Sequence, residues 1–309
     1  MTTDTYLEKN NGIVQIKDLP HCFEILRSFH EAGYLFRGHE DVDYRLVTTI
    51  DRHGGNFKWQ RERFLMREFS RRVHHYLPLE SIPNTTLELL ALMQHYGAPT
   101  RLLDFTKSPF IALYFAVKDV LMDKDAAVWA LMPHNIRTIS LKKIREKDEE
   151  LVKNIGKLQN PFSQFTHEPL FTKWFMADKQ NSGFHEIVRH HEIIMDVEPL
   201  MMNGRLTVQQ GIFLVSGSSC RTFEETLIDL FDELQNDLPA EATEPSLAKI
   251  IIPKYLRLPL MKELEMMNIN ASSLFEGLEG FARFLKESIV TKNGIDIAPS
   301  LWNFEDEIK

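Results

Sequence analysis

The stretch from residue 92 to residue 116 most constrains what this chain can fold into. Its apolar spacing predicts two helices joined by a short polar turn. Gly97 stands where the first helix needs a left-handed C-cap, and Ser108 followed by Pro109 is typical of the start of the second. The second helix has almost no polar face, so we expect it to lie in the core.

The turn between these helices is rich in side chains that can bind a ligand. They are His95, Thr100, Arg101, Asp104, Thr106 and Lys107. Polar groups held between buried helices commonly serve a functional site. Upstream, residues 34–37 predict a short apolar strand that ends in Arg37. A buried arginine needs an anionic partner, which here is either an internal ion pair with Asp104 or a bound phosphate or carboxylate.

Composition places the chain among ordinary globular proteins. Its 309 residues, 43% of them hydrophobic, are enough for one large core. The two cysteines, Cys22 and Cys220, form no CxxC pattern, which favours a reducing, cytoplasmic compartment. Residues 1–12 are polar and predicted to be disordered. No apolar run is long enough to cross a bilayer, so we expect no membrane association.

Several classes of site are disfavoured by the sequence. A formal charge of -8 argues against extended nucleic-acid binding. Residues 58–75 carry a local excess of basic residues, which fits either the solvated face of a helix or a surface that faces phosphates. Residues 185–189 miss the HExxH zinc pattern because the last of them is Arg189, so we expect no metal. A P-loop pattern is also absent from the sequence.

The order of predicted elements indicates an α+β fold with a central mixed sheet surrounded by helices. Predicted strands occupy residues 13–16, 34–37, 127–132, 192–197, 211–215 and 249–252. Predicted helices include one capped by Asp18 and others at residues 57–77, 87–96, 108–121 and 137–158, the last of which we expect to be charged and exposed. We expect a single domain over residues 13–290 with a charged helical insertion near residues 137–183, irregular from residue 162, and a C-terminal tail at residues 291–309.

Two of these segments together resemble the FRG domain, a family that takes its name from a Phe-Arg-Gly motif. The motif stands here as Phe36, Arg37 and Gly38, and the stretch at residues 92–116 carries the rest of the likeness. The resemblance extends to residues 206–213 and, more weakly, to residues 274–281. It implies one FRG-type domain over most of the chain, of the kind expected in a toxin or phage-defence effector.

The same segments are similar in order to the motifs of ADP-ribosyltransferases. Residues 34–37 look like the strand that ends in the arginine gripping the NAD phosphates. Asp104-Phe-Thr-Lys-Ser-Pro-Phe-Ile-Ala-Leu-Tyr-Phe-Ala116 looks like the Ser-Thr-Ser strand end and the helix after it. Gln209 and Gln210, in a predicted strand-edge segment, fall where that superfamily has its catalytic glutamate. Glutamine can bond the ribose but supplies no charge, so Asp104, Glu186 or Glu192 would have to provide the carboxylate.

The resemblance implies an ADP-ribosyltransferase-like fold with NAD as co-substrate. Asp104 and Gln210 are the implied catalytic residues. The implied cofactor-binding residues are Arg37, Gly38, His95, Arg101, Thr106 and Gln209. His95 could instead bond a loop carbonyl, and Arg101 could tie the loop to an acidic residue elsewhere. The first hypothesis is thus a transferase or NAD glycohydrolase acting on an unknown macromolecular acceptor or water. The alternative is a non-enzymatic module that senses a nucleotide or binds a protein.

Overall fold

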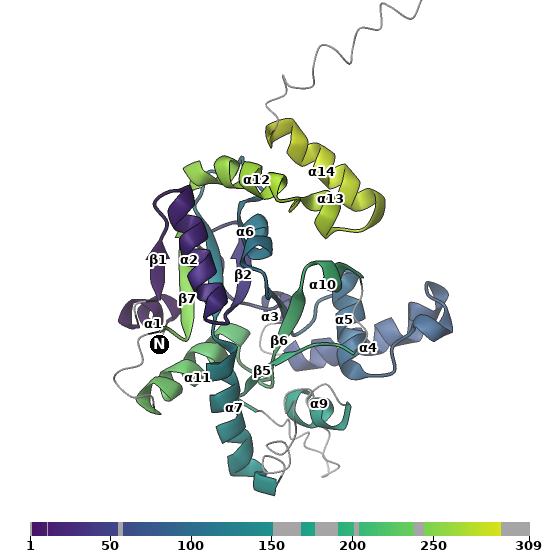
Figure 1. The fold of residues 1–309 in the computed structure, drawn as a ribbon. Coiled ribbons are helices and arrows are strands. Elements are labelled where there is room, and N and C mark those ends of the chain that lie inside the picture. Colours follow the sequence, from purple (N-terminus) through teal and green to yellow (C-terminus); the bar gives the residue numbers. More distant parts are fainter. Residues whose placement is uncertain are drawn as a thin grey trace, which may run out of the picture.

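The protein is built on one seven-stranded mixed sheet (Figure 1). The computed structural model describes residues 2–10, 12–54, 58–150, 168–176, 191–200, 204–237 and 244–291. The strand order is β1-β7-β4-β2-β3-β6-β5, in which β1 pairs parallel to β7 and the other neighbours pair antiparallel. This confirms the predicted α+β fold with a central mixed sheet surrounded by helices.

The strands follow the predicted apolar segments, with one addition. They are β1 (Ile13–Gln15), β2 (Leu35–His39), β3 (Leu102–Thr106), β4 (Ala126–Leu131), β5 (Ile194–Val197), β6 (Gly211–Ser216) and β7 (Leu247–Ile252). Strand β3 lies in the polar segment that the sequence predicts to be a turn. It pairs with β6 along its whole length, and its side chains alternate between the two faces of the sheet.

Two groups of helices cover one face of the sheet. Over the half formed by β1, β7, β4 and β2 lie α2 (Leu19–Glu31), α6 (Pro109–Val117), α12 (Arg257–Met266) and α13 (Ala271–Leu274), followed by α14 (Gly277–Thr291). Over β3, β6 and β5 lie α4 (Lys58–Arg72), α5 (Thr86–His95) and α9 (Glu168–Phe175). Ser108 caps α6 and Asp18 caps α2, as predicted, and Gly97 adopts a positive φ of 82° after α5.

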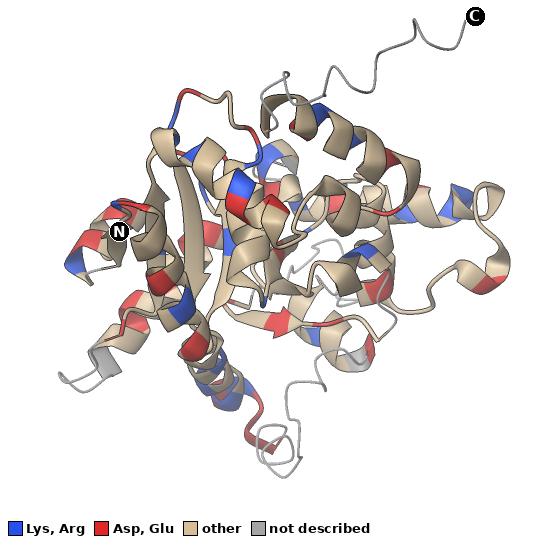
Figure 2. Cartoon of the chain, turned by 45° about the horizontal axis from the view of Figure 1, so that its top comes forward, with Lys and Arg blue, Asp and Glu red and all other residues tan. Residues whose placement is uncertain are grey.

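The opposite face is covered by α1 (Thr3–Lys9), α7 (Pro133–Lys147) and α11 (Phe223–Asp237). The remaining helices are α3 (Thr49–Gly54) and α10 (Gly204–Val208), with short 3-10 turns at η2 (Val73–His75), η3 (Leu79–Ser81) and η5 (Lys254–Leu256). Acidic and basic residues are interspersed over the surrounding helices and loops (Figure 2).

The predicted disorder of residues 1–12 is wrong for most of that segment. Residues 3–9 form α1, which Thr2 caps through a hydrogen bond from the backbone N–H of Thr5. Tyr6 and Leu7 are fully buried, and the Tyr6 ring stacks on Phe231 of α11. The helix is therefore held by two apolar side chains in an otherwise polar segment, a signal too sparse for periodicity to detect.

The expected exposed helix at residues 137–158 is also only partly right. Helix α7 begins at Pro133 and ends at Lys147, and it buries Ile136, Ile139 and Ile144 against the sheet and its neighbours. The stretch predicted to be irregular from residue 162 contains helix α9, whose Phe171, Trp174 and Phe175 are buried. Residues 151–167 and 177–190 of the expected insertion, and residues 292–309 of the expected tail, lie outside the described residues.

The sheet opens between its central strand, β2, and the neighbouring β3. Strand β2 pairs with β4 along its whole length, but its ladder with β3 is recorded at one position, Phe36 opposite Thr106. Beyond that pair the two strands separate, and Arg37, Gly38 and His39 follow on β2 beside the opening. In the Phe-Arg-Gly motif, Phe36 therefore forms the last pair with β3, and Arg37 and Gly38 lie beside a gap in the sheet.

Gly38 lets helix α6 lie directly on β2. A Cβ at this position would stand 1.9 Å from the carbonyl oxygen of Ala112 and 2.7 Å from the backbone nitrogen of Ala116. Both atoms belong to helix backbone, so neither can move aside alone. The glycine of the motif is thus required for packing, whatever it contributes to a ligand site.

We expect Gly38→Ala to lower the free energy of unfolding by about 3 kcal/mol or more, because α6 must be displaced from the sheet. Gly33→Ala is the matched control, since Gly33 has a φ of 85° but a Cβ there would meet no atom within 4 Å. It should lose about 1 kcal/mol from backbone strain alone. Urea denaturation of both variants measures the difference, and equal losses would contradict the packing role of Gly38.

Candidate functional site

A cavity of about 250 Å³ lies where the two groups of helices meet over the opening in the sheet. Its lining comes from β2, β3, β6, α5, α6 and α10 and the turn before β6. The apolar part includes Phe36, Phe115, Leu206 and Phe213. The polar part comprises Arg37, Gln94, His95, Asp104, Thr106, Arg205 and Gln209. Most of the residues predicted to form a site are therefore brought together, from strands far apart in the sequence.

Arg37 bridges the opening between β2 and β3. One Nη1 hydrogen is donated to the backbone carbonyl of Asp104, at 2.6 Å, and Nε–H is donated to Nε2 of His39, at 3.0 Å. The Asp104 carboxylate is farther from Nη1, at 3.9 Å, and its side chain is 60% exposed. The internal pair weighed in the sequence analysis thus exists only as a long, solvated contact. Because a guanidinium has five N–H groups, hydrogens remain that can bind an anion in the cavity.

His39 fixes the orientation of Arg37. A guanidinium Nε is always protonated, so Nε2 of His39 must be the ring nitrogen without a hydrogen. The other nitrogen, Nδ1, then carries the hydrogen and donates it to the carbonyl of Tyr44, at 3.2 Å. The indole N–H of Trp129 also approaches Nδ1, at 3.1 Å, but could donate to it only in the opposite tautomer. That tautomer would set two N–H groups against each other at Arg37 and leave the carbonyl of Tyr44 without this donor, whereas the assigned tautomer leaves only the indole N–H without an acceptor on the ring.

Burial and charge keep His39 neutral. Burial lowers its pKa to about 3, assisted by the positive charge of Arg37. The pKa of Arg37 is itself lowered, first by burial, while the negative charge of Asp104 opposes the shift and Arg52 adds to it. A neutral His39 remains a hydrogen-bond acceptor for Arg37 at every pH at which the protein is expected to work.

The depressed pKa of His39 predicts a pH-dependent loss of stability. Below the ordinary histidine pKa of about 6.5, the unfolded state binds a proton that the native state does not. The free energy of unfolding therefore falls by up to about 1.4 kcal/mol per pH unit until the pH nears 3. Between pH 7 and 5.5 we expect the wild type to lose about 1 kcal/mol more than His39→Gln in urea denaturation. Parallel losses in the two proteins would refute a neutral, buried His39.

Asp104 is held at the edge of the cavity by a residue that the sequence analysis missed. The side-chain amide of Gln94, on α5, donates to Oδ1 of Asp104 at 2.8 Å, and its carbonyl accepts the hydroxyl of Thr100. These bonds orient the carboxylate without removing it from solvent. Gln94 directly precedes His95 in the sequence. This position next to the polar segment is the one sequence feature that could have indicated a role in the site.

The hydroxyl motif and the two glutamines occupy different positions. Thr106 lines the cavity, but its hydroxyl donates to the carbonyl of Gln209 at 2.7 Å and accepts from the backbone N–H of Ser108 at 3.0 Å. Gln209 also lines the cavity, and its amide donates to the carbonyl of Leu274 at 3.0 Å. Gln210 is exposed, has a positive φ of 47° and is absent from the lining. The predicted strand there is wrong, because both glutamines form the turn between α10 and β6.

Two cationic or aromatic contacts lie at the wall of the cavity, each joining a lining residue (Arg205 or His95) to a ring outside the lining. The guanidinium of Arg205, on α10, lies 4.8 Å from the ring centre of Phe275, which in turn lies 6.1 Å from the ring of Phe115. His95 stands at the end of α5 with its ring 4.9 Å from Tyr96, in a T-shaped contact. Arg205 belongs to no recognised motif and is not among the predicted site residues.

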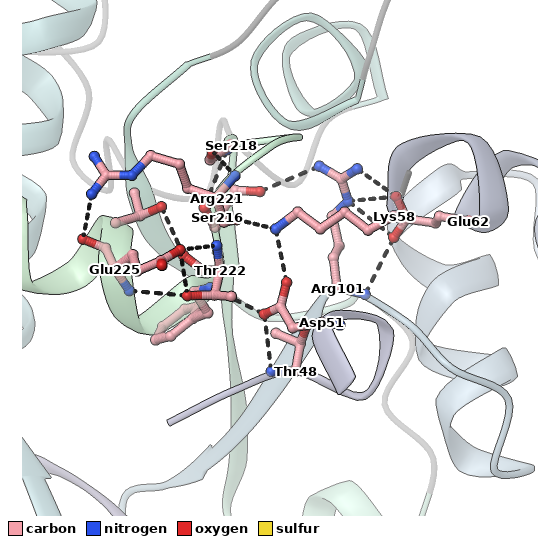
Figure 3. Close-up of polar contacts among 12 residues, drawn as sticks. Thr48, Asp51, Lys58, Glu62, Arg101, Ser216, Ser218, Arg221, Thr222 and Glu225 are labelled. Atoms are coloured by element: carbon pink, nitrogen blue, oxygen red, sulfur yellow. Dashed lines mark hydrogen bonds and ion pairs between the residues drawn. The ribbon is translucent and has the colours of Figure 1, made fainter. Parts of the chain in front are cut away.

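Arg101 lies outside the cavity, in a buried polar network (Figure 3). Its Nε donates to both carboxylate oxygens of Glu62, at 3.0 and 2.7 Å, and Nη2 pairs with the same carboxylate. Nη1 donates to the carbonyls of Phe175 and Ser216. Of the two roles that the sequence left open for Arg101, the structure shows the second: it ties the loop to an acidic residue, Glu62. Its prediction as a cofactor-binding residue is therefore corrected.

We expect Glu62→Gln to lower the free energy of unfolding by about 3–5 kcal/mol, because it leaves the Arg101 guanidinium buried without its counter-charge. Glu68→Gln on the same helix is the control. Its partners Arg71 and Arg72 are more than 60% exposed, so the loss should stay within about 1 kcal/mol. Chemical denaturation of the two variants tests this, and similar losses would mean that the buried pair has no special weight.

The other candidate carboxylates do not contribute to the cavity. Glu192 lies outside its lining and faces Arg221, at 3.4 Å, while Glu186 lies outside the described residues. Within the described part of the chain, no group of three potential metal-ligating side chains comes together. No helix among the described residues combines the length and the apolar character needed to span a membrane.

Comparison with known proteins identifies one family. The model of the FRG domain matches residues 32–126, from the end of α2 to the first residue of β4. No curated protein and no solved structure matches the chain. An FRG domain is thus confirmed over residues 32–126, a segment that contains Arg37, Gly38, Asp104 and Thr106. Its extension over most of the chain, to residues 206–213 and 274–281, stays a prediction. The similarity to ADP-ribosyltransferases stays a prediction.

Proposed function

We propose that this FRG-domain protein is an NAD-dependent ADP-ribosyltransferase-like enzyme that cleaves NAD and transfers the ADP-ribose to an acceptor or to water. Such an activity suits a toxin or phage-defence effector. Arg37 would hold a phosphate of NAD, and the aromatic cavity would receive one of its two rings. The observation that carries the proposal is the position of a preorganised arginine and an oriented carboxylate, Asp104, on one small cavity.

The reaction requires a group that stabilises positive charge. The bond between C1′ of the ribose and the nicotinamide nitrogen breaks, and its electron pair leaves with neutral nicotinamide. The ribose becomes an oxocarbenium-like cation, as in glycoside hydrolysis. Water or another nucleophile then attacks C1′ and loses a proton. Among the described residues that line the cavity, Asp104 is the one carboxylate that could stabilise the cation or accept this proton.

The placement of the glutamines refines the assignment of roles. Gln209, which lines the cavity, replaces Gln210 as the residue we expect to bond a ribose hydroxyl. One hydrogen of its side-chain amide is donated to the carbonyl of Leu274, which leaves the side-chain oxygen and the second N–H for a ligand. Gln210 would act only through the shape of the turn, in which its carbonyl accepts the backbone N–H of Lys107 at 3.0 Å.

A second function, binding without turnover, has one observation in its favour. The Asp104 carboxylate accepts a hydrogen bond from Gln94 and stands 3.9 Å from Arg37, so it is partly engaged and 60% exposed. A solvated carboxylate stabilises a nearby cation less than one in a dry site. In this case the protein would be a nucleotide-sensing or interaction module that uses the same cavity.

The experiment is incubation of the purified protein with NAD, with nicotinamide followed by chromatography and the melting temperature measured in parallel. We expect wild type to release nicotinamide and Arg37→Gln to lose both release and the thermal shift. Asp104→Asn should keep the thermal shift, since asparagine can still accept from Gln94, but release nicotinamide at least about 100-fold more slowly.

Each outcome assigns a function. A thermal shift by NAD without nicotinamide release would favour the sensing module over the enzyme. Release that survives in Asp104→Asn would move the catalytic role away from this carboxylate. Gln210→Glu serves as a further control, because an exposed residue outside the cavity should not change the rate. With neither release nor a shift, the proposed use of NAD would be wrong.

A further inference from the structure

A second hollow adjoins the cavity on the other side of Arg37. It has a volume of about 510 Å³, and the two spaces share Arg37, Gly38 and Phe115. The first cavity, at about 250 Å³, is smaller than the roughly 300–1,000 Å³ of a usual small-molecule site. It can therefore accommodate one ring-bearing part of a larger ligand, and the shared wall directs the remainder into the hollow.

Four cationic side chains of the described residues line the hollow, and two of them are already paired with a carboxylate. Lys118 pairs with Glu40 at 2.7 Å, and Arg45 pairs with Glu224. The only counter-charge that Arg37 meets among the described residues is the Asp104 carboxylate, at the long distance of 3.9 Å. Arg52, which is exposed on α3, makes no side-chain hydrogen bond or ion pair with any residue that the structure describes.

Arg37 and Arg52 line the same hollow, and no carboxylate of the described lining residues is available to pair with either of them. Among the described residues of the lining, Glu40 is the only acidic one, and it is paired with Lys118. Two like charges directed at one hollow repel each other, and the charge of Arg52 adds to the effect of burial in lowering the pKa of Arg37. A bound anion would remove this repulsion, and a guanidinium is suited to bind phosphate oxygens in pairs.

We propose that Arg52 and Arg37 form a two-arginine clamp for a diphosphate group, with Arg37 between the ring-bearing cavity and the hollow and Arg52 holding the second phosphate. The ligand class is therefore a nucleoside diphosphate or a molecule that contains one, and a monophosphate leaves Arg52 unused. This inference rests on the proposed function only for the ring in the first cavity, since the clamp itself requires nothing but the phosphates.

The clamp is tested by calorimetric titration of the full chain with AMP, ADP, inorganic pyrophosphate and NAD. Arg52→Gln removes the second guanidinium from an exposed position, and Arg52→Lys retains a charge without the paired N–H groups. Arg27→Gln, an exposed arginine of α2 outside the hollow, controls for the change in net charge. We expect Arg52→Gln to weaken ADP about tenfold and AMP less than about twofold, with Arg52→Lys in between and Arg27→Gln unchanged.

The results separate this inference from the proposed function. Equal weakening of ADP and AMP by Arg52→Gln, or no more weakening than in Arg27→Gln, would overturn the clamp even if NAD is cleaved. Arg52-dependent binding of ADP and pyrophosphate with no binding of NAD would support the clamp and contradict the use of NAD. If neither ADP nor pyrophosphate binds the wild type, the clamp is wrong.

Discussion

The separation of β2 from β3 is the constraint on which the rest of this architecture depends. A closed ladder would leave no space at the centre of the sheet, yet an open one leaves backbone groups in need of partners. Arg37 resolves this by donating across the gap to the carbonyl of Asp104. The same side chain then becomes the wall common to the cavity and the hollow. The guanidinium of Arg37 thus both supports the open sheet and lines the candidate site.

A second set of charges keeps the rim of this opening in place. Glu62 and Arg101 join α4 to the start of β3, and Lys58 pairs with Asp51 of α3 at 2.8 Å (Figure 3). Buried ion pairs add little net stability relative to apolar packing, because both charges must be desolvated. Their value lies in specificity, since few other arrangements could satisfy them. They fix the position of Arg101, the residue before β3, and hence the position of Asp104 three residues later.

Local signals account for the part of the fold that the sequence could predict. Caps such as Asp18 and Ser108 fix helix ends within a few residues, so they can be read without the rest of the chain. Strand β3 could not be read in this way, because its pairing with β6 is set by a segment far along the chain. The same holds for the site: Arg37 and Asp104 were marked by motifs, whereas the contribution of Arg205 arises only when α10 packs beside the cavity.

Helix α3 joins the buried network to the hollow through two adjacent residues. It has six residues, too few to be stable alone, and it is held by Asp51, whose carboxylate accepts from Lys58 and from the backbone N–H of Phe223. Arg52 follows directly and lines the hollow. Binding and local order are thermodynamically linked. If the buried network strengthens the binding of an anion at Arg52, then the bound anion stabilises the network by the same free energy. If the proposed clamp binds its anion, the interior pair and the surface arginine are thus coupled through the backbone of α3, without requiring a side-chain contact between them.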